Sequence, residues 1–306
     1  MSTWKDLKTV IYEKDGPIAL ITLNRPESLN AYDIPMCREL TRVWLDFRDD
    51  PKLQVAILTG KGRAFCAGGD VKSPENVFNE AARKELRTSH KALKAWEEGG
   101  KEPGPEVLRH PPFPTPRTRF NIWKPIIAAV NGWAVAGGFA MVLNSDIVVA
   151  SEEAKFGITQ SKVGFISPLT GGATAFRYMP KAVALYMTLT GQPVTAHQAM
   201  QWGLCTHVVS PKELLPTARS IADTIVRDVS PTSIRAMKES FYRAFWRGAE
   251  EDIKFSASLM NQRVVDKGNY AEGMRAFAER RTPKWEAPSE GQDKKQATDN
   301  EEDSRY

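Results

Sequence analysis

The sequence predicts a mixed α/β fold in which a strand-rich first half precedes an α-helical C-terminal third. Two short apolar runs, Val55–Gly60 and Ile126–Val130, do not alternate with polar residues, as is typical of strands covered on both faces. From Leu214 onward the apolar residues recur at helical spacing instead. The chain has 306 residues, of which 42% are hydrophobic, so it can build a substantial core.

Composition narrows the class of protein. The start, MSTWKDLKTV, lacks the basic-then-apolar layout of a secretory signal, so we expect a cytoplasmic protein. Three widely spaced cysteines (Cys37, Cys66 and Cys205) indicate neither a disulfide framework nor a metal site. The net charge is +5, but 42 basic residues are interspersed with 37 acidic ones, so nucleic acid is not implied. A mildly basic balance equally suits a phosphate-bearing ligand. The longest apolar stretch, 126–151, contains two asparagines and an aspartate, so we expect no membrane span.

The first elements are predicted from turn and helix signals. Residues 9–24 place Asp15-Gly16 between two apolar runs, which indicates a β-hairpin. Asp33 followed by Pro35 indicates the start of a helix. Its buried face has apolar residues at spacings of three and four, namely Leu40, Val43, Trp44 and Phe47.

A glycine-rich turn, residues 62–70, follows the strand at Val55–Gly60. Residues 75–98 look helical, whereas residues 99–118 are rich in proline and glycine and predict a long ordered loop or lid.

A second glycine-rich turn follows the strand at Ile126–Val130. The chain turns at Asn131-Gly132, reaches the pair Gly137-Gly138, and continues into an apolar helix and another apolar strand. A glycine pair before a helix leaves bare backbone N–H groups at the positive end of the helix dipole, so it is a candidate oxyanion site. The alternative is that both glycines only let the helix pack closely on a sheet.

The C-terminal third is predicted to consist of helices and a polar tail. The helices are expected at residues 182–189, 195–202, 214–229, 231–245, 249–262 and 270–281. Beyond Trp285 the tail has almost no apolar content, so residues 286–306 are expected to be disordered.

Six segments, in order, resemble the crotonase superfamily, which comprises the enoyl-CoA hydratase/isomerase-like proteins. They are LNRPESLNAYD (23–33), VAILTGKGRAFCAGGDV (55–71), KPIIAAVNGWAVAGGFAMVLNSDIVVAS (124–151), AKFGITQSKVGF (154–165), LTGQPVTAHQAMQWGL (189–204) and EGMRAFAERRTPKW (272–285). The resemblance implies a spiral of ββα turns over residues 1–205, with an insertion near 99–118, and a helical region over 206–285 that mediates trimer or hexamer formation.

The resemblance also implies a substrate and a site. Such proteins bind acyl-CoA, so coenzyme A is expected as part of the substrate and no prosthetic group is expected. Two backbone N–H groups stabilise the thioester enolate, and they match Gly69 and Gly137. Around AGGD, Ala67 and Asp70 match the region that receives the adenine end of coenzyme A. Two further matches are Arg25, near the phosphates, and Phe277, which would reach a neighbouring ligand.

The chain departs from the family where hydratases carry two glutamates. Those positions are Ala140 and Gln160, and neither side chain is ionisable. Gln160 can orient a water or a carbonyl by hydrogen bonding, but it cannot act as the base. The interval from Asp70 to Asn131 is longer than usual for the family and contains His90 and His110. His90 is a candidate for the relocated acid/base, and the alternative is a solvated helix histidine.

These observations predict an active lyase or isomerase that acts on a CoA thioester through an enolate. General acid/base groups contribute roughly 10² to 10⁴ in rate, and an intact pair of donors supplies a comparable term, so loss of both glutamates does not imply inactivity. The long insertion favours a bulky acyl group. Two alternatives stay open, namely carbon–carbon bond cleavage and a non-catalytic role in binding coenzyme A or RNA.

Overall fold

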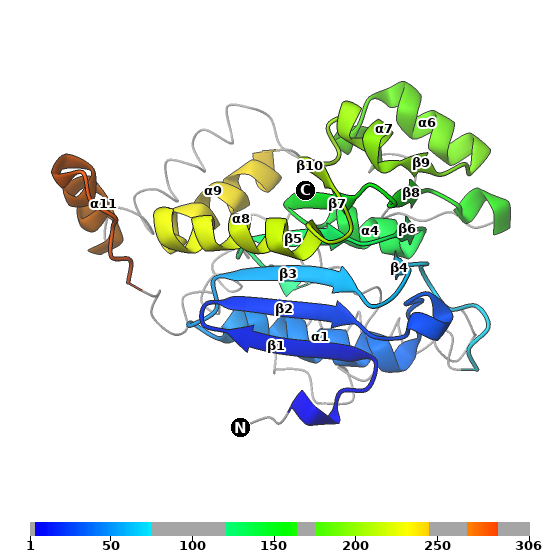
Figure 1. The fold of residues 1–306 in the computed structure, drawn as a ribbon, viewed down its shortest axis with the longest axis horizontal. Helices are drawn as coiled ribbons and strands as arrows, with labels where there is room; N and C mark the ends of the chain where they lie inside the picture. The colour runs from blue at the N-terminus through cyan, green and yellow to red at the C-terminus, as the bar shows by residue number, and fades with distance from the viewer. Residues whose placement is uncertain (1–3, 75–119, 164–174, 245–267, 287–306) are drawn as a thin grey trace, which may run out of the picture.

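A six-stranded sheet runs through the centre of the computed structural model, which describes residues 4–74, 120–163, 175–244 and 268–286 (Figure 1). The strand order is β1 (Val10–Asp15), β2 (Ile18–Leu23), β3 (Val55–Gly60), β5 (Ile126–Val130), β7 (Ile147–Ser151) and β10 (His207–Val209). Neighbouring strands are parallel except for the antiparallel β1–β2 pair. The predicted mixed α/β fold is confirmed.

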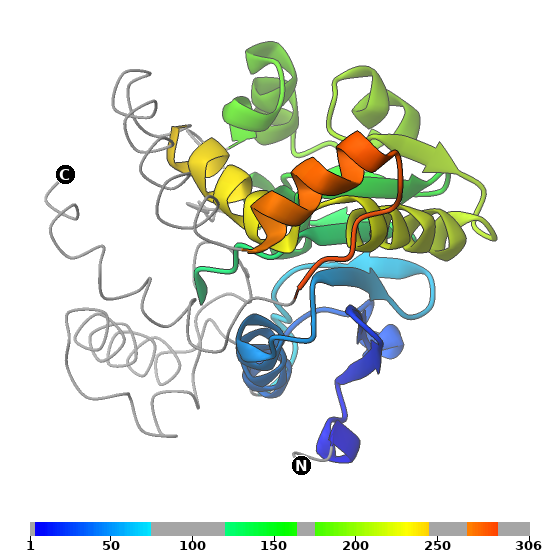
Figure 2. The same ribbon diagram turned by 90° about the vertical axis from the view of Figure 1, so that its left-hand side faces the viewer.

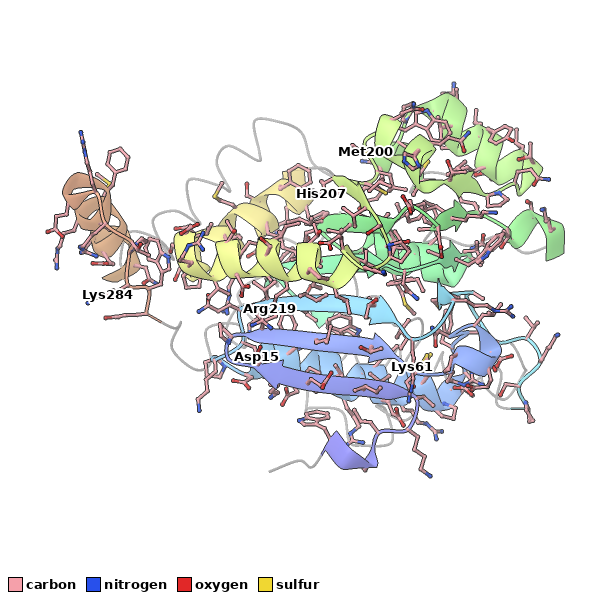
Figure 3. All side chains as sticks on the ribbon, in the orientation of Figure 1. Asp15, Lys61, Met200, His207, Arg219 and Lys284 are labelled. Atoms are coloured by element: carbon pink, nitrogen blue, oxygen red, sulfur yellow. The ribbon has the colours of Figure 1, made fainter. Side chains whose placement is uncertain are left out.

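The first two strands form the predicted hairpin. Asp15 pairs with Ile18 across the turn, where Gly16 has a φ of 55°, a conformation that glycine adopts without steric cost. The hairpin end is tied to the helix α8 (Leu214–Asp228), because Arg219 Nη1 lies 2.6 Å from Asp15 Oδ2. Figure 3 labels both side chains.

The helix α1 (Ile34–Asp49) begins where the sequence predicts. The Oδ1 atom of Asp33 accepts a hydrogen bond from the backbone N–H of Met36 at 3.0 Å, which is a side-chain cap of the first turn. The predicted apolar face of α1 is buried, including Trp44 and Phe47 at 0% exposure.

Side chains of the large sheet point alternately into two cores. On β3, Val55 and Ile57 pack with α8, whereas Ala56 and Leu58 join the larger cluster that includes α1. Figure 2 shows α1 and α8 on opposite sides of the sheet. Both faces of β3 are covered, which explains why its sequence does not alternate between apolar and polar residues. The strand was predicted from this lack of alternation.

A second sheet of four short strands positions the candidate site. It consists of β4 (Ala64–Cys66), β6 (Trp133–Val135), β8 (Lys155–Gly157) and β9 (Val194–Thr195). β4, β6 and β8 are parallel, and β9 is antiparallel to β8. The predicted apolar helix, α4 (Gly137–Leu143), follows β6 directly.

The described chain after β9 is mostly helical, as predicted. Its helices are α7 (Ala196–Gln201), α8, α9 (Pro231–Ala244) and α11 (Gly268–Glu279), and α5 (Ala175–Tyr178) and α6 (Lys181–Thr190) precede β9. Three short 3-10 helices lie at Trp4–Asp6, Pro26–Ser28 and Gln160–Val163. The predicted ranges differ from the observed ones only at their ends, where helix boundaries are least defined.

Some predictions fall outside the described residues. These are the helix at 75–98, the loop at 99–118, the helix at 249–262 and nearly all of the polar tail. The division into residues 1–205 and 206–285 stays a prediction. The strand β10, just after that boundary, pairs with β7 in the large sheet.

The last described helix, α11, lies at the left edge of Figure 1. It is joined to α9 by Asn269, whose Nδ2 donates to Thr232 Oγ1 at 3.3 Å. Asn269 also fixes the chain after α11, since its Oδ1 accepts from the N–H of Glu286 at 2.8 Å.

Candidate active site

Three parallel strands of the small sheet end at the same edge and lead to the predicted site residues. β4 is followed by the segment that contains Gly69, β6 by the segment that contains Gly137, and β8 by the segment that contains Gln160. Since β4, β6 and β8 are parallel neighbours, their carboxyl ends lie at one edge. The fold therefore collects these residues from distant parts of the sequence.

Gly69 is held by a parallel bridge to Tyr32. The Tyr32 N–H donates to the carbonyl of Gly68 at 2.8 Å, and the Asp70 N–H donates to the carbonyl of Tyr32 at 2.9 Å. Both bonds use groups that flank Gly69, so the N–H of Gly69 takes no part in the bridge and points away from Tyr32. Gly69 is partly exposed.

Gly137 opens α4 and lies against the same glycine-rich segment. A Cβ atom built on Gly68 would lie 3.0 Å from the Gly137 nitrogen. Helix geometry leaves the first N–H of α4 without an acceptor inside the helix. The segments that contain Gly69 and Gly137 therefore touch, and the role of their N–H groups in holding a carbonyl oxygen that gains negative charge stays a prediction.

Ala136, which precedes Gly137, has a strained backbone with φ 52° and ψ −119°. A side chain rarely tolerates this region, and the cost is typically about 1–3 kcal/mol. The conformation is held from both sides, because the Ala136 N–H donates to the Gly157 carbonyl at 2.9 Å and the Ala136 carbonyl accepts from the Ala140 N–H at 3.2 Å. The Gly137 peptide is therefore fixed between β8 and α4.

Arg25 organises the base of the AGGD turn. Its Nη2 lies 3.1 Å from Asp33 Oδ2 and 2.9 Å from Asp70 Oδ2, and its Nη1 donates to the carbonyl of Ala31. Asp70 also accepts from the N–H groups of Lys72 and Ser73, so it caps the turn that follows. The predicted roles of Arg25 and Asp70 in binding coenzyme A stay predictions.

Cys66 supports the same turn from inside the protein. Its Sγ accepts from the N–H of Gly68 at 3.4 Å. Burial raises the pKa of the Cys66 thiol to about 12, so the thiol stays protonated at neutral pH and is a poor nucleophile.

The two positions that are predicted to match the hydratase glutamates lie in the segments that surround this edge. Ala140 is in the first turn of α4 and is buried at 2% exposure. Gln160 begins the 3-10 helix after β8 and is buried at 7% exposure. The small apolar group and the neutral amide leave these two positions without a carboxylate to accept a proton.

The remaining predicted residues are dispersed. Ala67 lies in the glycine-rich segment and donates its N–H to the Leu29 carbonyl at 3.0 Å. Phe277 is 85% exposed on α11. His90 and His110 lie outside the described residues.

The described residues show neither a metal site nor a helix that could span a membrane. In the described ranges, no three His, Cys, Asp or Glu side chains gather closely enough to hold a metal ion. No described helix combines the length and the apolar character needed to cross a bilayer.

Tyr32 contacts both glycine segments and was not predicted as a site residue from the sequence. A Cβ atom built on Gly137 would lie 2.1 Å from the Tyr32 hydroxyl oxygen, so the Tyr32 side chain touches the Gly137 segment while its backbone holds the Gly69 segment. The only local signal was an aromatic residue next to a helix cap, which is also typical of an ordinary core residue.

The two sheets, the helical C-terminal region and the converging glycine segments define a crotonase-type protein. The chain belongs to the enoyl-CoA hydratase/isomerase family, whose pattern matches residues 13–102 and 112–288. It is therefore a member of an enzyme family that acts on CoA thioesters.

Individual relatives agree with this assignment. The chain is 36% identical over 275 residues to an (E)-benzylidenesuccinyl-CoA hydratase from Thauera aromatica, covering 90% of this chain and 97% of the relative. It is 34% identical to a carnitinyl-CoA dehydratase from Proteus mirabilis, covering 88% and 95%. An enoyl-CoA hydratase/isomerase structure from Mycobacterium paratuberculosis superposes with a TM-score of 0.77 at 29% identity, covering 92% of this chain and 100% of that one.

Proposed function

We propose that this protein is a lyase that adds water to, or removes it from, a CoA thioester with a bulky acyl group. The observation that supports the proposal most directly is the contact between Gly68 and Gly137, which joins the two segments that contain the predicted donors. In this proposal both N–H groups bind the thioester oxygen. Each donor then stabilises the enolate-like transition state by about 3–4 kcal/mol.

The proposed reaction adds water across the double bond next to the thioester. The water oxygen bonds to the β-carbon, electrons move onto the thioester oxygen, and the α-carbon then takes a proton. The amide of Gln160 orients water or the carbonyl by hydrogen bonding. A group outside positions 140 and 160 moves the proton, and His90 is the candidate from the sequence.

The acyl group is proposed to be larger than a plain chain. Two observations support this, namely the long interval between Asp70 and Asn131 and the names of two relatives, which specify benzylidenesuccinyl and carnitinyl thioesters. The names of these relatives also specify a hydratase and a dehydratase, which favours water as the second reactant.

A direct test compares cinnamoyl-CoA with crotonyl-CoA as substrates in ¹⁸O-labelled water. We expect label at the β-carbon of the product and a kcat/KM at least about tenfold higher for the aryl thioester, as in other pockets that select by size. Equal rates would contradict the bulky acyl group. Failure of both thioesters to bind in calorimetry would contradict the whole proposal.

Carbon–carbon bond cleavage is the second candidate, because the side chains at Ala140 and Gln160 are not ionisable. Such cleavage needs the enolate site but no pair of water-activating glutamates. Incubation with a β-keto acyl-CoA distinguishes the two reactions, since cleavage yields a shortened thioester and hydration of the enoyl-CoA does not.

The donor pair has a spectroscopic test of its own. Donors on the carbonyl oxygen of cinnamoyl-CoA extend its conjugation, so we expect its near-ultraviolet absorption to shift to longer wavelength on binding. An unshifted spectrum of the bound thioester would contradict the two-donor site. A Gly137→Pro variant is unsuitable as a control, because its ring would remove the N–H and also meet Tyr32.

We also propose a trimer or a hexamer located in the cytoplasm. Support comes from α11, where Met274 is 58% exposed and Phe277 is 85% exposed, so an apolar surface remains for a neighbouring subunit. Sedimentation equilibrium tests the assembly. A monomer would contradict it, and a trimer whose affinity for the thioester is unchanged by Phe277→Ala would contradict the predicted role of that side chain.

A further inference from the structure

We propose that Tyr32 is the positioning residue that sets the spacing between the two donor N–H groups of Gly69 and Gly137. This inference rests on the proposed function, because it assigns a cause to the geometry of the same site. Tyr32 is 1% exposed, so its side chain acts from beneath the site and does not contact the substrate.

The backbone of Tyr32 fixes the first donor. Its N–H and carbonyl make hydrogen bonds of 2.8 and 2.9 Å to Gly68 and Asp70, the two neighbours of Gly69. Two bonds on either side of one residue define both the position and the direction of its peptide plane. The chain after Tyr32 is fixed in turn, since Asp33 caps α1 and pairs with Arg25.

The side chain of Tyr32 limits the position of the second donor. A Cβ atom built on Gly137 would lie 2.1 Å from the Tyr32 hydroxyl oxygen, 2.6 Å from Cε1 and 2.7 Å from Cζ. The edge of the ring therefore fills the space that any other residue at position 137 would use. Because the ring is rigid and fully packed, the Gly137 peptide cannot move toward Tyr32.

The buried phenol of Tyr32 is uncharged. Burial raises the pKa of the Tyr32 phenol well above its usual value, so the group stays protonated over the working range of pH. The phenol therefore adds no charge that would compete with the developing enolate.

The experiment compares Tyr32→Leu with Tyr32→Phe, using Phe47→Leu as a matched control. Phe47 is equally buried in α1 and belongs to the same core, so its replacement reproduces the loss of an aromatic ring away from the site. We expect Tyr32→Leu to lower kcat by roughly 10- to 100-fold with little change in KM, since a donor misplaced by a fraction of an ångström loses most of its transition-state effect. It should also reduce the spectral shift of bound cinnamoyl-CoA.

Tyr32→Phe should keep most of kcat and of the spectral shift, because Cε1 and Cζ retain their contact with Gly137. Phe47→Leu should lose stability without a selective loss of kcat. If Phe47→Leu and Tyr32→Leu reduce kcat equally, or if Tyr32→Leu keeps the full spectral shift, the positioning role is wrong.

A double-mutant cycle tests the contact without any substrate. Gly137→Ala should strongly destabilise the wild type and should destabilise the Tyr32→Leu protein much less, because the smaller side chain leaves room for the added methyl group. Equal effects in both backgrounds would overturn the proposed contact. If Gly137→Ala is less destabilising in the Tyr32→Leu background but the protein binds no acyl-CoA, the contact between Tyr32 and Gly137 stands and the proposed function is wrong.

Discussion

At the scale of single residues, the glycine pair at positions 137 and 138 is explained by what lies beside it. Neither glycine is among the residues with positive φ, so backbone freedom does not require them. A Cβ atom on Gly138 would lie 2.0 Å from the carbonyl oxygen of Cys66, and a Cβ atom on Gly137 would meet Tyr32. Close packing of α4 on a sheet therefore explains Gly138, because Cys66 belongs to β4, whereas the Tyr32 side chain explains Gly137. Neither contact excludes the donor proposed at Gly137.

Gly138→Ala is expected to destabilise the protein by at least about 3 kcal/mol, at the upper end of the range for overpacked cores, because the obstructing atom belongs to the backbone. Urea unfolding measures the loss. Gly203→Asn is the control, since Gly203 has a φ of 78° and no atom within 4 Å of an added Cβ. That change should cost less than about 1 kcal/mol, because asparagine tolerates the left-handed region. Similar losses in the two variants would contradict the packing argument.

The candidate site was only partly predictable at this scale. The glycines of AGGD and of the central pair were identified because glycine-rich turns after buried strands are visible locally. Tyr32 was missed because its contact with Gly137 joins distant parts of the chain. No periodic pattern in either segment carries information about the other.

At the scale of elements, long strands and helices were predicted well and short ones were not. The strand at Val55–Gly60 and the helix at Ile34–Asp49 each contain enough residues to show a pattern and an end signal. β4, β6 and β8 have three residues each, which is too few for alternation to appear. These three strands carry the candidate site, so the sequence indicated the glycines but not the elements that bring them together.

An ion pair between Glu272 of α11 and Arg281, which follows the helix, has a predictable dependence on pH. A hydrogen bond from Arg281, and another from the Lys284 N–H, lower the pKa of Glu272 from 4.5 to about 2. A lowered pKa in the folded state stabilises α11 above about pH 4.5, and this stabilisation is lost as the pH falls toward 2.

We therefore expect Glu272→Gln to reduce the protection of α11 amides from hydrogen exchange at pH 5–7. The difference from the wild type should shrink steadily between pH 4.5 and pH 2. Arg281→Gln should give the same trend, because it removes the other partner. A difference that is constant over this range would show that the pair does not stabilise α11.

At the scale of the whole molecule, a buried ionic cluster joins α9 to the large sheet. Asp146 accepts from the Ile126 N–H at 2.7 Å, lies 2.7 Å from Lys238 Nζ and accepts from the Tyr242 hydroxyl at 3.1 Å. Lys238 also donates to the carbonyl of Lys124 at 2.8 Å. The start of β5 is thereby fixed to a helix of the C-terminal region.

Lys238→Met should cost about 3 kcal/mol of unfolding free energy, because it leaves Asp146 largely buried without its cation. The matched control is Arg227→Met in α8, whose partner Asp228 is 2.7 Å away but solvent-exposed, so this change should lower the free energy of unfolding much less than Lys238→Met does. Thermal unfolding with a urea series measures both. Losses of equal size would contradict the role assigned to the cluster.

The arrangement of the whole chain could not be worked out from single segments. The sequence predicted the mixed α/β class, and the resemblance implied the crotonase fold that the comparisons confirm. The pairing of β2 with β3 and of β7 with β10 depends on contacts between residues far apart in the chain. Such contacts form when the apolar faces of all helices and sheets are buried together, and the pattern within a single segment does not predict them.

The convergence of β4, β6 and β8 has an evolutionary consequence. The groups proposed to activate the thioester belong to the main chain, so exchange of a side chain that does not pack against these segments leaves them in place. Positions such as 140 and 160 are then free to vary, and a duplicated gene can acquire a different reaction through a few codon changes without rebuilding its activating groups. In such a lineage the side chains around the thioester change, while the proposed main-chain stabilisation of the thioester is inherited with the fold.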